Sequence, residues 1–363
     1  MSLRGKAAIV GIGELPTQRI APGRSMYGLC AEAARLAIED AGLRKEDIDG
    51  LVTSEAPSGM ADYLGIRPVF STGVSMQGAS GATSVTVASA AIAAGLCNYA
   101  LIVIGRAREA QAGGGSRGPG SIGAEFEAPF GPAAGAGTGY ALMYSRHMYE
   151  YGTTPEQMAK LAVDQRFNAQ ANPNAVFRGE PITIDDVLNS RYVNVPLHLL
   201  ECVMPCDGAA ACIITTPERA KALPNRPVFV LGAGLEQANA HIWQTDRITT
   251  TPARVSAARA FQMAGYGPRD MQFAEFYDCY TILVAMTLED AGFVKKGEIG
   301  PFYESTDTTY KGTFPINTDG GQLSGGQPGL AGGFRHVIEA TRQIMGRGGE
   351  RQVANNDLCM VNG

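Results

Sequence analysis

Apolar residues along the first hundred positions alternate between short continuous runs and helical stripes. The runs predict buried strands, because they are rich in Ile, Val and Leu and bounded by turn residues (7–13, 49–54 and 99–105). The stripes predict helices, the first of which stops at Gly42 (26–42 and 83–95). Strands that alternate with helices are typical of a sheet covered on its faces, so the pattern predicts an α/β fold.

One long stretch without charge needs a separate explanation. Residues 71–105 contain no Asp, Glu, Lys or Arg, which is long enough to cross a bilayer. The sequences GASGAT and AAGLCNY divide the stretch into two shorter pieces. We therefore expect a small-residue helix followed by a buried strand, and no membrane span.

The second half of the chain repeats the pattern of the first. IVGIGE at 9–14 corresponds to VLGAGL at 230–235, and residues 33–55 correspond to 256–278 at a constant offset. The offset holds through an alanine stripe, a glycine stop, an acidic residue and the strand that follows. Amphipathic coincidence would reproduce only the stripe, so the sequence predicts a duplicated α/β unit.

We expect the N-terminal half to span 1–225 and the C-terminal half to span 226–363. A segment of different character, about 109–199, is predicted as an inserted loop domain in the first half. It opens with glycine-rich sequence and then predicts two helices. The second helix begins at TPEQ, with Thr153 or Thr154 as cap and Pro155 in its first turn. Insertions of this kind are a natural place for substrate contacts.

Composition narrows the possible functions. The net charge is −5 and no run of Lys or Arg occurs, which argues against a general nucleic-acid binder. Seven cysteines without framework spacing predict a reducing, cytoplasmic setting with mostly buried thiols. Cys202, Cys206 and Cys212 cluster, but no histidine lies among them, so we expect no metal site. MSLRGK leads directly into a strand, so no signal peptide is expected.

The sequence QGASGATSV at 77–85 is a glycine-rich turn that leads into a helix. Such a turn presents backbone N–H groups and one side chain to a ligand in front of the helix. An enzyme would place a nucleophile there, yet Gly78 has no side chain and Ser80 has no evident base beside it. We expect Ser80 to cap the turn.

Four stretches resemble the thiolase superfamily, in its sterol-carrier-protein-X-like or lipid-transfer branch: GASGATSV (78–85), PLHLLECVMPCDGAAACIITT (196–216), AEFYDCYTIL (274–283) and NTDGGQLSGGQPGLAGG (317–333). The resemblance implies a five-layered α-β-α-β-α thiolase fold with two duplicated halves and an inserted loop domain. It also implies a homodimer that acts on acyl-CoA thioesters. Coenzyme A would be part of the substrate, and no cofactor would be bound tightly.

The chain departs from that family at three motif positions. Family members carry a nucleophilic cysteine in CASG and histidines in HDCF and GHP, whereas this chain reads GASG, YDCY and GQP. None of its four histidines lies in a motif, and no thiolate at residue 78 can form an acyl-enzyme. The resemblance assigns catalytic positions to Tyr277, Cys279 and Gln327, turn or oxyanion positions to Gly78, Ser80 and Gly326, and supporting positions to Asp278 and Tyr280.

Retro-aldol cleavage of a β-hydroxyacyl-CoA needs no nucleophile, only a base and donors that hold the emerging enolate. We expect the turns Gly320-Gly321 and Gly325-Gly326 to offer backbone N–H groups to the thioester oxygen. Tyr277 could donate a hydrogen bond, or act as acid/base if its pKa is lowered. A subset of the branch cleaves steroid side-chain CoA esters in this way, with tyrosine in the YDC position and a small OB-fold zinc-ribbon partner.

Three functions stay open on the sequence alone. The first is retro-aldol C–C cleavage of a β-hydroxyacyl-CoA. The second is an acetyl-CoA acetyltransferase type of thiolase with a non-standard nucleophile. The third is a non-catalytic CoA-ester-binding subunit. Structural alternatives also stand: Tyr277 packed at a strand end, Cys279 an inert core thiol, and Asp278 an anchor for backbone.

Overall fold

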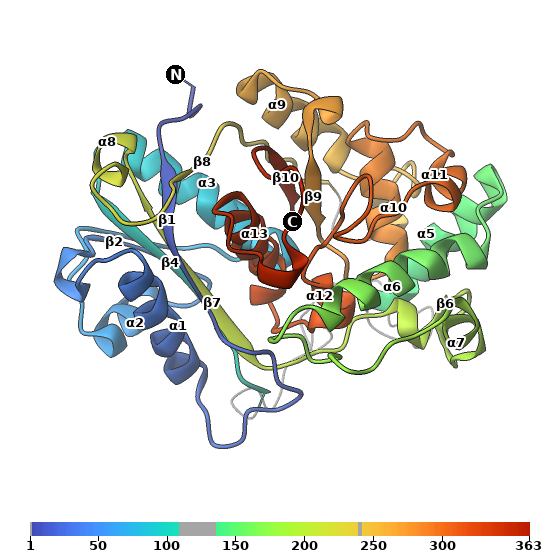
Figure 1. Cartoon of the computed structure of the whole chain (residues 1–363), viewed down its shortest axis with the longest axis horizontal. Helices are drawn as coiled ribbons and strands as arrows, with labels where there is room; N and C mark the ends of the chain where they lie inside the picture. Colours follow the sequence, from blue (N-terminus) through green and yellow to red (C-terminus); the bar gives the residue numbers. More distant parts are fainter. Residues whose placement is uncertain (1, 109–135, 239–241) are drawn as a thin grey trace.

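The computed structural model describes residues 2–108, 136–238 and 242–363 (Figure 1). The glycine-rich opening of the predicted insertion lies outside the described residues. The main sheet has six strands in the order β3-β2-β4-β7-β1-β8. These strands are β1 (Ala8–Glu14), β2 (Gly50–Thr53), β3 (Phe70–Gly73), β4 (Tyr99–Arg106), β7 (Gly208–Thr215) and β8 (Val228–Phe229). β2 runs parallel to β3 and β4, whereas β7 is antiparallel to β4 and β1.

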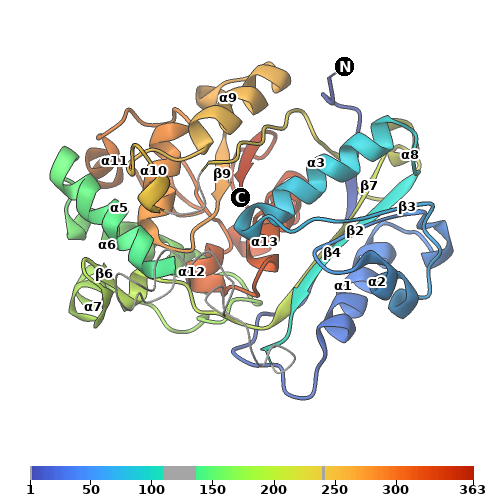
Figure 2. The same ribbon diagram turned by 180° about the vertical axis from the view of Figure 1, so that it is seen from behind.

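A second sheet pairs β9 (Phe273–Phe276) in parallel with β10 (Cys359–Asn362). Helices α3 (Ser80–Ala93) and α13 (Ala331–Ile344) lie between the two sheets and share one apolar core with the main sheet (Figures 1 and 2). The far face of the main sheet is covered by α1 (Met26–Asp40) and α2 (Pro57–Leu64). On the far side of β9 lie α9 (Ala253–Ala264) and α10 (Thr281–Asp290). The result is the predicted succession of five layers.

The two halves repeat one another in a specific contact. A Cβ added to Gly13 of β1 would lie 2.7 Å from the backbone nitrogen of Ala37 in α1. A Cβ added to Gly234 would lie 3.1 Å from the backbone nitrogen of Ala260 in α9. Ala37 and Ala260 are equivalent under the sequence offset, so both halves need glycine for the same close approach of a helix.

Three sequence predictions differ from the structure. The chain between 54 and 83 forms α2 and β3, where the sequence pattern predicted only a turn. Helix α3 begins at Ser80, three residues before the predicted start. The segment 230–235 forms no described strand, because Val230 closes the short pairing of β8 with β1. The division at 225/226 stays a prediction, and β8, just beyond it, belongs to the first sheet.

The described part of the insertion brings helices from the first half against the second. It contains α5 (Ala136–Tyr151), α6 (Pro155–Gln170), α7 (Ile184–Asn189) and the short strands β5 (Tyr192–Asn194) and β6 (Leu197–His198). Thr154, not Thr153, caps α6, in a capping box with Gln157. Helices α5 and α6 share a core with α10 and α11 (Ile299–Ser305), beside the short helix α12 (Gly321–Gly325). The short helix α8 (Pro217–Ala220) follows β7. Among the described residues, no helix has the length and apolar character to span a bilayer.

Candidate active site

The Tyr277 side chain lies against Gly78, the residue of the glycine-rich turn that has no side chain. Its backbone N–H donates to the carbonyl of Asn362 on β10, 3.1 Å away, directly after β9 ends. A Cβ added to Gly78 would lie 2.5 Å from Cε2 and 2.8 Å from Cε1 of the Tyr277 ring, and closer still to Cζ. These distances are far below ordinary van der Waals contact, so the phenol ring fills the space that a side chain at residue 78 would need.

The Tyr277 hydroxyl is held by Gln327. The Gln327 amide Nε2 donates to Oη over 2.9 Å. Gln327 is itself fixed, because its backbone N–H donates to Met204 O and its carbonyl accepts from Cys206 N. Among the described residues no acceptor faces the Tyr277 O–H, which leaves this hydrogen for a ligand. Tyr277 and Gln327, which stand where the family has histidines, therefore form one hydrogen-bonded pair.

The pKa of Tyr277 is raised, not lowered. Burial is the main cause, and the neighbouring Cys279 thiol adds to it. Burial also raises the pKa of Cys279 well above its usual range, so its thiol is neutral. The neutral phenol can donate a hydrogen bond or a proton, and the phenolate base allowed for on sequence grounds is disfavoured.

Ser80 holds the turn together. Its Oγ donates to the carbonyl of Gln77 over 2.7 Å and accepts from the N–H of Met76 over 2.9 Å. The side chain is fully buried. The N–H of Gly78, at the start of α3, has no acceptor among the described residues, so the turn keeps one donor for a ligand.

The second glycine-rich loop does not offer the donors that we expected. The N–H groups of Gly320, Gly321 and Gly326 donate to Asn317 O, Asp319 Oδ1 and Gln322 O, respectively. The loop folds onto itself as α12 and uses these groups internally. Gly326 instead permits a close approach, since a Cβ there would lie 2.9 Å from Cys206 Sγ, and its φ is +98°.

Asp278 anchors the start of α12. Its buried carboxylate accepts from the N–H groups of Gln322 (2.9 Å) and Leu323 (3.1 Å). An acidic group suits a helix N-terminus, where N–H groups lack acceptors. The two consecutive side chains therefore contact different elements: Tyr277 lies against the turn of Gly78, and Asp278 binds the start of α12.

The insertion contributes a residue that the sequence analysis missed. The ring of Tyr140 on α5 packs against that of Tyr280, with centroids 4.6 Å apart and an interplanar angle of 30°, and Tyr140 interacts with the Cys279 thiol. The Cys279 thiol and burial raise the pKa of Tyr140 well above its usual range. A tyrosine on a helix carries no motif, so no local signal pointed to it.

His336 of α13 is the second residue missed. Its ring lies 6.5 Å from the Tyr277 ring, centroid to centroid, at an interplanar angle of 65°. Its position, directly after the GQPGLAGGFR segment, was the only available clue. Burial would lower the pKa of His336, but hydrogen bonds and charges from Asp278 and Glu275 outweigh it and raise the pKa to about 9. The histidine is therefore an imidazolium at neutral pH.

Known proteins are similar to this chain over nearly its whole length. The family described as "Thiolase C-terminal domain-like" matches residues 234–363. The chain is 36% identical over 357 residues to an acetyl-CoA acetyltransferase of Methanothermobacter thermautotrophicus, covering 93% of this chain and 90% of the relative. It is 34% identical over 365 residues to a steroid side-chain-cleaving aldolase of Thermomonospora curvata, covering 95% and 91%.

The fold comparison agrees. A solved structure described as "Ltp2-ChsH2(DUF35) aldolase" superimposes with a TM-score of 0.87 at 32% identity, covering 97% of this chain and 94% of that one. The predicted thiolase fold is confirmed. Each of these relatives is more than 30% identical to the chain, and each match covers nearly the whole of both proteins. This chain therefore belongs to the thiolase superfamily, in its lipid-transfer branch.

Proposed function

We propose that this protein is an acyl-CoA lyase that cleaves the C–C bond of a β-hydroxyacyl-CoA by a retro-aldol reaction, without a covalent intermediate. One observation carries the proposal: the Tyr277 ring occupies the space beside Gly78 where an attacking side chain would stand. A site built this way excludes a nucleophile and supplies a hydrogen-bond donor in its place. Coenzyme A enters as part of the substrate, and no cofactor is needed.

The chemistry can be followed through the donors of the site. A base removes the proton of the β-hydroxyl, the bond between the α and β carbons breaks, and a carbonyl forms at the β carbon. The electron pair moves to the α carbon, and the negative charge develops on the thioester oxygen. The protonated base then returns the proton to the α carbon, which gives the shortened acyl-CoA. We propose that the Tyr277 O–H and the Gly78 N–H, neither of which has an acceptor among the described residues, donate to that oxygen. Each donor of this type is worth roughly 3–4 kcal/mol of barrier.

The base is expected to come from outside this set of residues. The tyrosine and cysteine side chains gathered here all have raised pKa values, which disfavours their charged forms: Tyr140, Tyr277, Cys279 and Tyr280. We therefore propose a shared site, completed by a small OB-fold zinc-ribbon protein. The solved relative described as a complex of Ltp2 with ChsH2(DUF35) supports a partner of this kind.

A direct test uses two defined substrates. 17-Hydroxy-3-oxo-4-pregnene-20-carboxyl-CoA should yield a 17-ketone and propanoyl-CoA, and 3-hydroxy-3-methylbutanoyl-CoA should yield acetone and acetyl-CoA. Turnover of either, with or without the partner, supports the proposal. Tyr277→Phe should lower kcat by about 100-fold or more, as the loss of one oxyanion donor does.

The matched control is Tyr303→Phe. The Tyr303 hydroxyl is fully buried in α11 and has no hydrogen-bond partner in the described structure, so its removal should leave turnover unchanged. Undiminished turnover by Tyr277→Phe would remove Tyr277 from the mechanism. Failure of the wild-type protein and partner to cleave any β-hydroxyacyl-CoA, with tight binding of the esters, would favour the non-catalytic CoA-ester-binding subunit.

A thiolase-type acyltransferase is the second candidate, because the acetyltransferase of M. thermautotrophicus is 36% identical. It would require another nucleophile, and both hydrogen bonds of Ser80 are used within the turn. We expect acetoacetyl-CoA and CoA to give neither thiolysis nor an acetylated protein. A stable acyl adduct in mass spectra would promote this candidate over the lyase.

We further propose a cytoplasmic homodimer. The seven cysteines are all free thiols, as a reducing compartment would keep them. The edge strand β3 is followed by apolar Met76 and preceded by Val69, whose side chain is 77% exposed. An exposed apolar edge of this kind favours pairing with a second copy. Light scattering should give twice the mass of the chain, and Val69→Lys should lower it to that of a monomer.

A further inference from the structure

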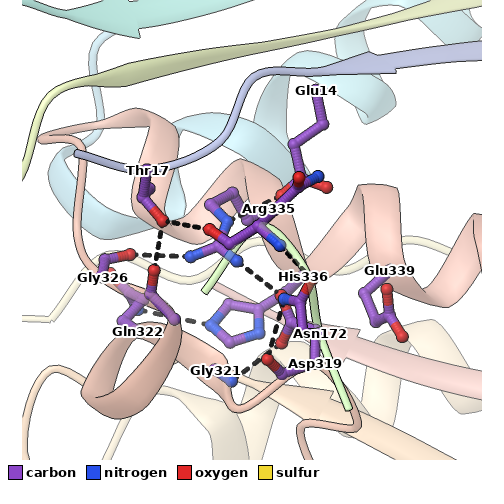
Figure 3. Close-up of polar contacts among 12 residues, drawn as sticks. Glu14, Thr17, Asn172, Asp319, Gly321, Gln322, Gly326, Arg335, His336 and Glu339 are labelled. Carbon is purple, nitrogen blue, oxygen red and sulfur yellow. Dashed lines mark hydrogen bonds and ion pairs between the residues drawn. The ribbon is translucent and has the colours of Figure 1, made fainter. Parts of the chain in front are cut away.

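Two consecutive buried residues of α13, Arg335 and His336 (Figure 3), contact the surroundings of the Tyr277–Gln327 pair. Arg335 holds the Gln327 side. Its guanidinium bonds to the carbonyl of Gly326, the residue before Gln327, over 2.8 Å. The same guanidinium pairs with Glu14 of β1 and Asp319, each at 2.8 Å. This side of the pair is therefore tied through one cation to β1 and to the loop that leads into α12.

His336 holds the Tyr277 side. Its Nε2 lies 3.1 Å from Asp278 Oδ1, and its Nδ1 lies 3.5 Å from Glu275 Oε2 on β9. The amide of Gln322 on α12 lies 3.3 Å from Nε2 (Figure 3). The imidazole and the Tyr277 ring meet at an interplanar angle of 65°. The histidine therefore contacts both the Tyr277 ring and the acidic residues on either side of it in the chain.

We propose that His336 is a positioning residue for the reaction: it ties the carboxylates before and after Tyr277 together, and so keeps the phenol over Gly78. The inference rests on the lyase function proposed above. Glu275 and Asp278 flank the Phe276–Tyr277 dipeptide, and His336 bridges them from α13. Rotation or displacement of Tyr277 would require the bridge to open.

The positive charge of His336 also supports its role toward Tyr277. The negative charge of Asp278 acts to raise the pKa of Tyr277, and the imidazolium beside Asp278 offsets that charge. The acidic groups that face His336 are Glu275, Asp278 and, more distantly, Asp319, all of them buried. Burial raises the pKa of Glu275 to about 7, so this group is only partly charged at neutral pH. To the extent that Glu275 and Asp278 are both charged, they would repel one another without a cation between them. Loss of His336 should both loosen Tyr277 and make it a weaker acid.

If His336 had only a structural role, its loss would lower stability without a specific effect on Tyr277. A second buried histidine, His147, provides a matched control. His147 is also completely buried and bonds to a carboxylate, Glu289, over 3.0 Å, with Thr153 on its other nitrogen. It belongs to α5, and its bonds involve neither Tyr277 nor the residues beside it. His147→Gln and His336→Gln each remove one buried imidazole–carboxylate bond, so both should lower stability.

The kinetic experiment compares the two variants on 3-hydroxy-3-methylbutanoyl-CoA with the partner present. His336→Gln should lower kcat by about 10- to 100-fold with KM changed less than about threefold, because misplacement of a reacting group costs on this scale. His147→Gln should keep the wild-type kcat. A folded His336→Gln with the wild-type kcat, or an equal loss in both variants, would overturn the positioning role.

A second readout does not depend on turnover. Tyrosine labelled with 13C at Cζ gives 13 signals, of which Tyr277 is identified by its loss in Tyr277→Phe. His336→Gln should shift the Tyr277 signal at neutral pH, and His147→Gln should leave it unchanged. An unmoved Tyr277 signal would refute the inference even where the lyase activity holds. A moved signal in a protein without turnover would uphold it and refute only the lyase.

Discussion

Gly78→Ala tests the packing on which the proposed chemistry depends. The new Cβ would lie 2.5 Å and 2.8 Å from two ring carbons of Tyr277, where ordinary contact begins at 3.4 Å. The ring must therefore move by about 1 Å away from Gly78, which disturbs the 2.9 Å hydrogen bond between its hydroxyl and the Gln327 amide. Overpacking of this kind costs about 1–3 kcal/mol of stability. A displacement on this scale should also lower turnover by about 100-fold.

The assay joins urea denaturation with turnover of 3-hydroxy-3-methylbutanoyl-CoA. Gly139→Ala is the matched control, because no atom of the described residues lies within 4 Å of its added Cβ and the residue is inside α5. That variant should keep its turnover and gain about 0.5–1 kcal/mol, since alanine is the better helix former. It shows what the glycine-to-alanine change does where there is room.

A double-mutant cycle isolates the contact. In a Tyr277→Ala background the ring is gone, so adding Gly78→Ala should be nearly neutral in stability, with a coupling of about 1–3 kcal/mol. Two results would refute the reasoning. One is a Gly78→Ala protein with wild-type stability and turnover. The other is an equal loss of stability with and without the Tyr277 ring.

Ser80→Ala should lower the free energy of unfolding by about 1 kcal/mol in urea titrations, because it removes two hydrogen bonds of the turn and leaves the partly buried N–H of Met76 without its partner; an acylated Ser80 in mass spectra would contradict its structural role. The pKa of His336 is about 9 in the folded protein against an ordinary 6.5, so its stabilisation is complete below pH 6.5 and is lost as the pH rises through 9. The unfolding free energy should therefore fall by up to about 3 kcal/mol over that range, and a fall of equal size in His336→Gln would contradict this assignment. Gly78→Cys, incubated with acetoacetyl-CoA, should yield no acetylated protein, since the Tyr277 ring stands where the introduced sulfur would lie; an acetyl group on the introduced thiol would mean that the ring moves aside readily.

Much of the fold could be predicted because its signals are local. The buried strands of the first half, the glycine stop of α1 and the cap of α6 each follow from a short run of residues. The duplication was visible because glycines and alanines recur at one offset, and the structure explains why: the same residues permit the same close helix approach. α2 and β3 escaped prediction because a four-residue edge strand is stabilised by its neighbour, and its own pattern is weak.

In the candidate site, the residue identities could be predicted from the sequence, but the contacts between them could not. The absence of a nucleophile at Gly78 and the replacement residues Tyr277 and Gln327 were evident from the motifs. Their mutual contact was not, nor was the internal use of the Gly320, Gly321 and Gly326 N–H groups. Backbone hydrogen bonds depend on where a loop folds, and residue types do not specify that.

By itself, the sequence determined the family, the α/β class and the chemical vacancy at residue 78, because these are properties of residue identity and spacing. Only the tertiary structure decided what fills that vacancy. The Tyr277 ring comes from the second half, Tyr140 from the insertion and His336 from the central helix layer. Groups so distant in the chain meet only after the two sheets pack about α3 and α13, and contact across that packing sets the protonation and position of the phenol.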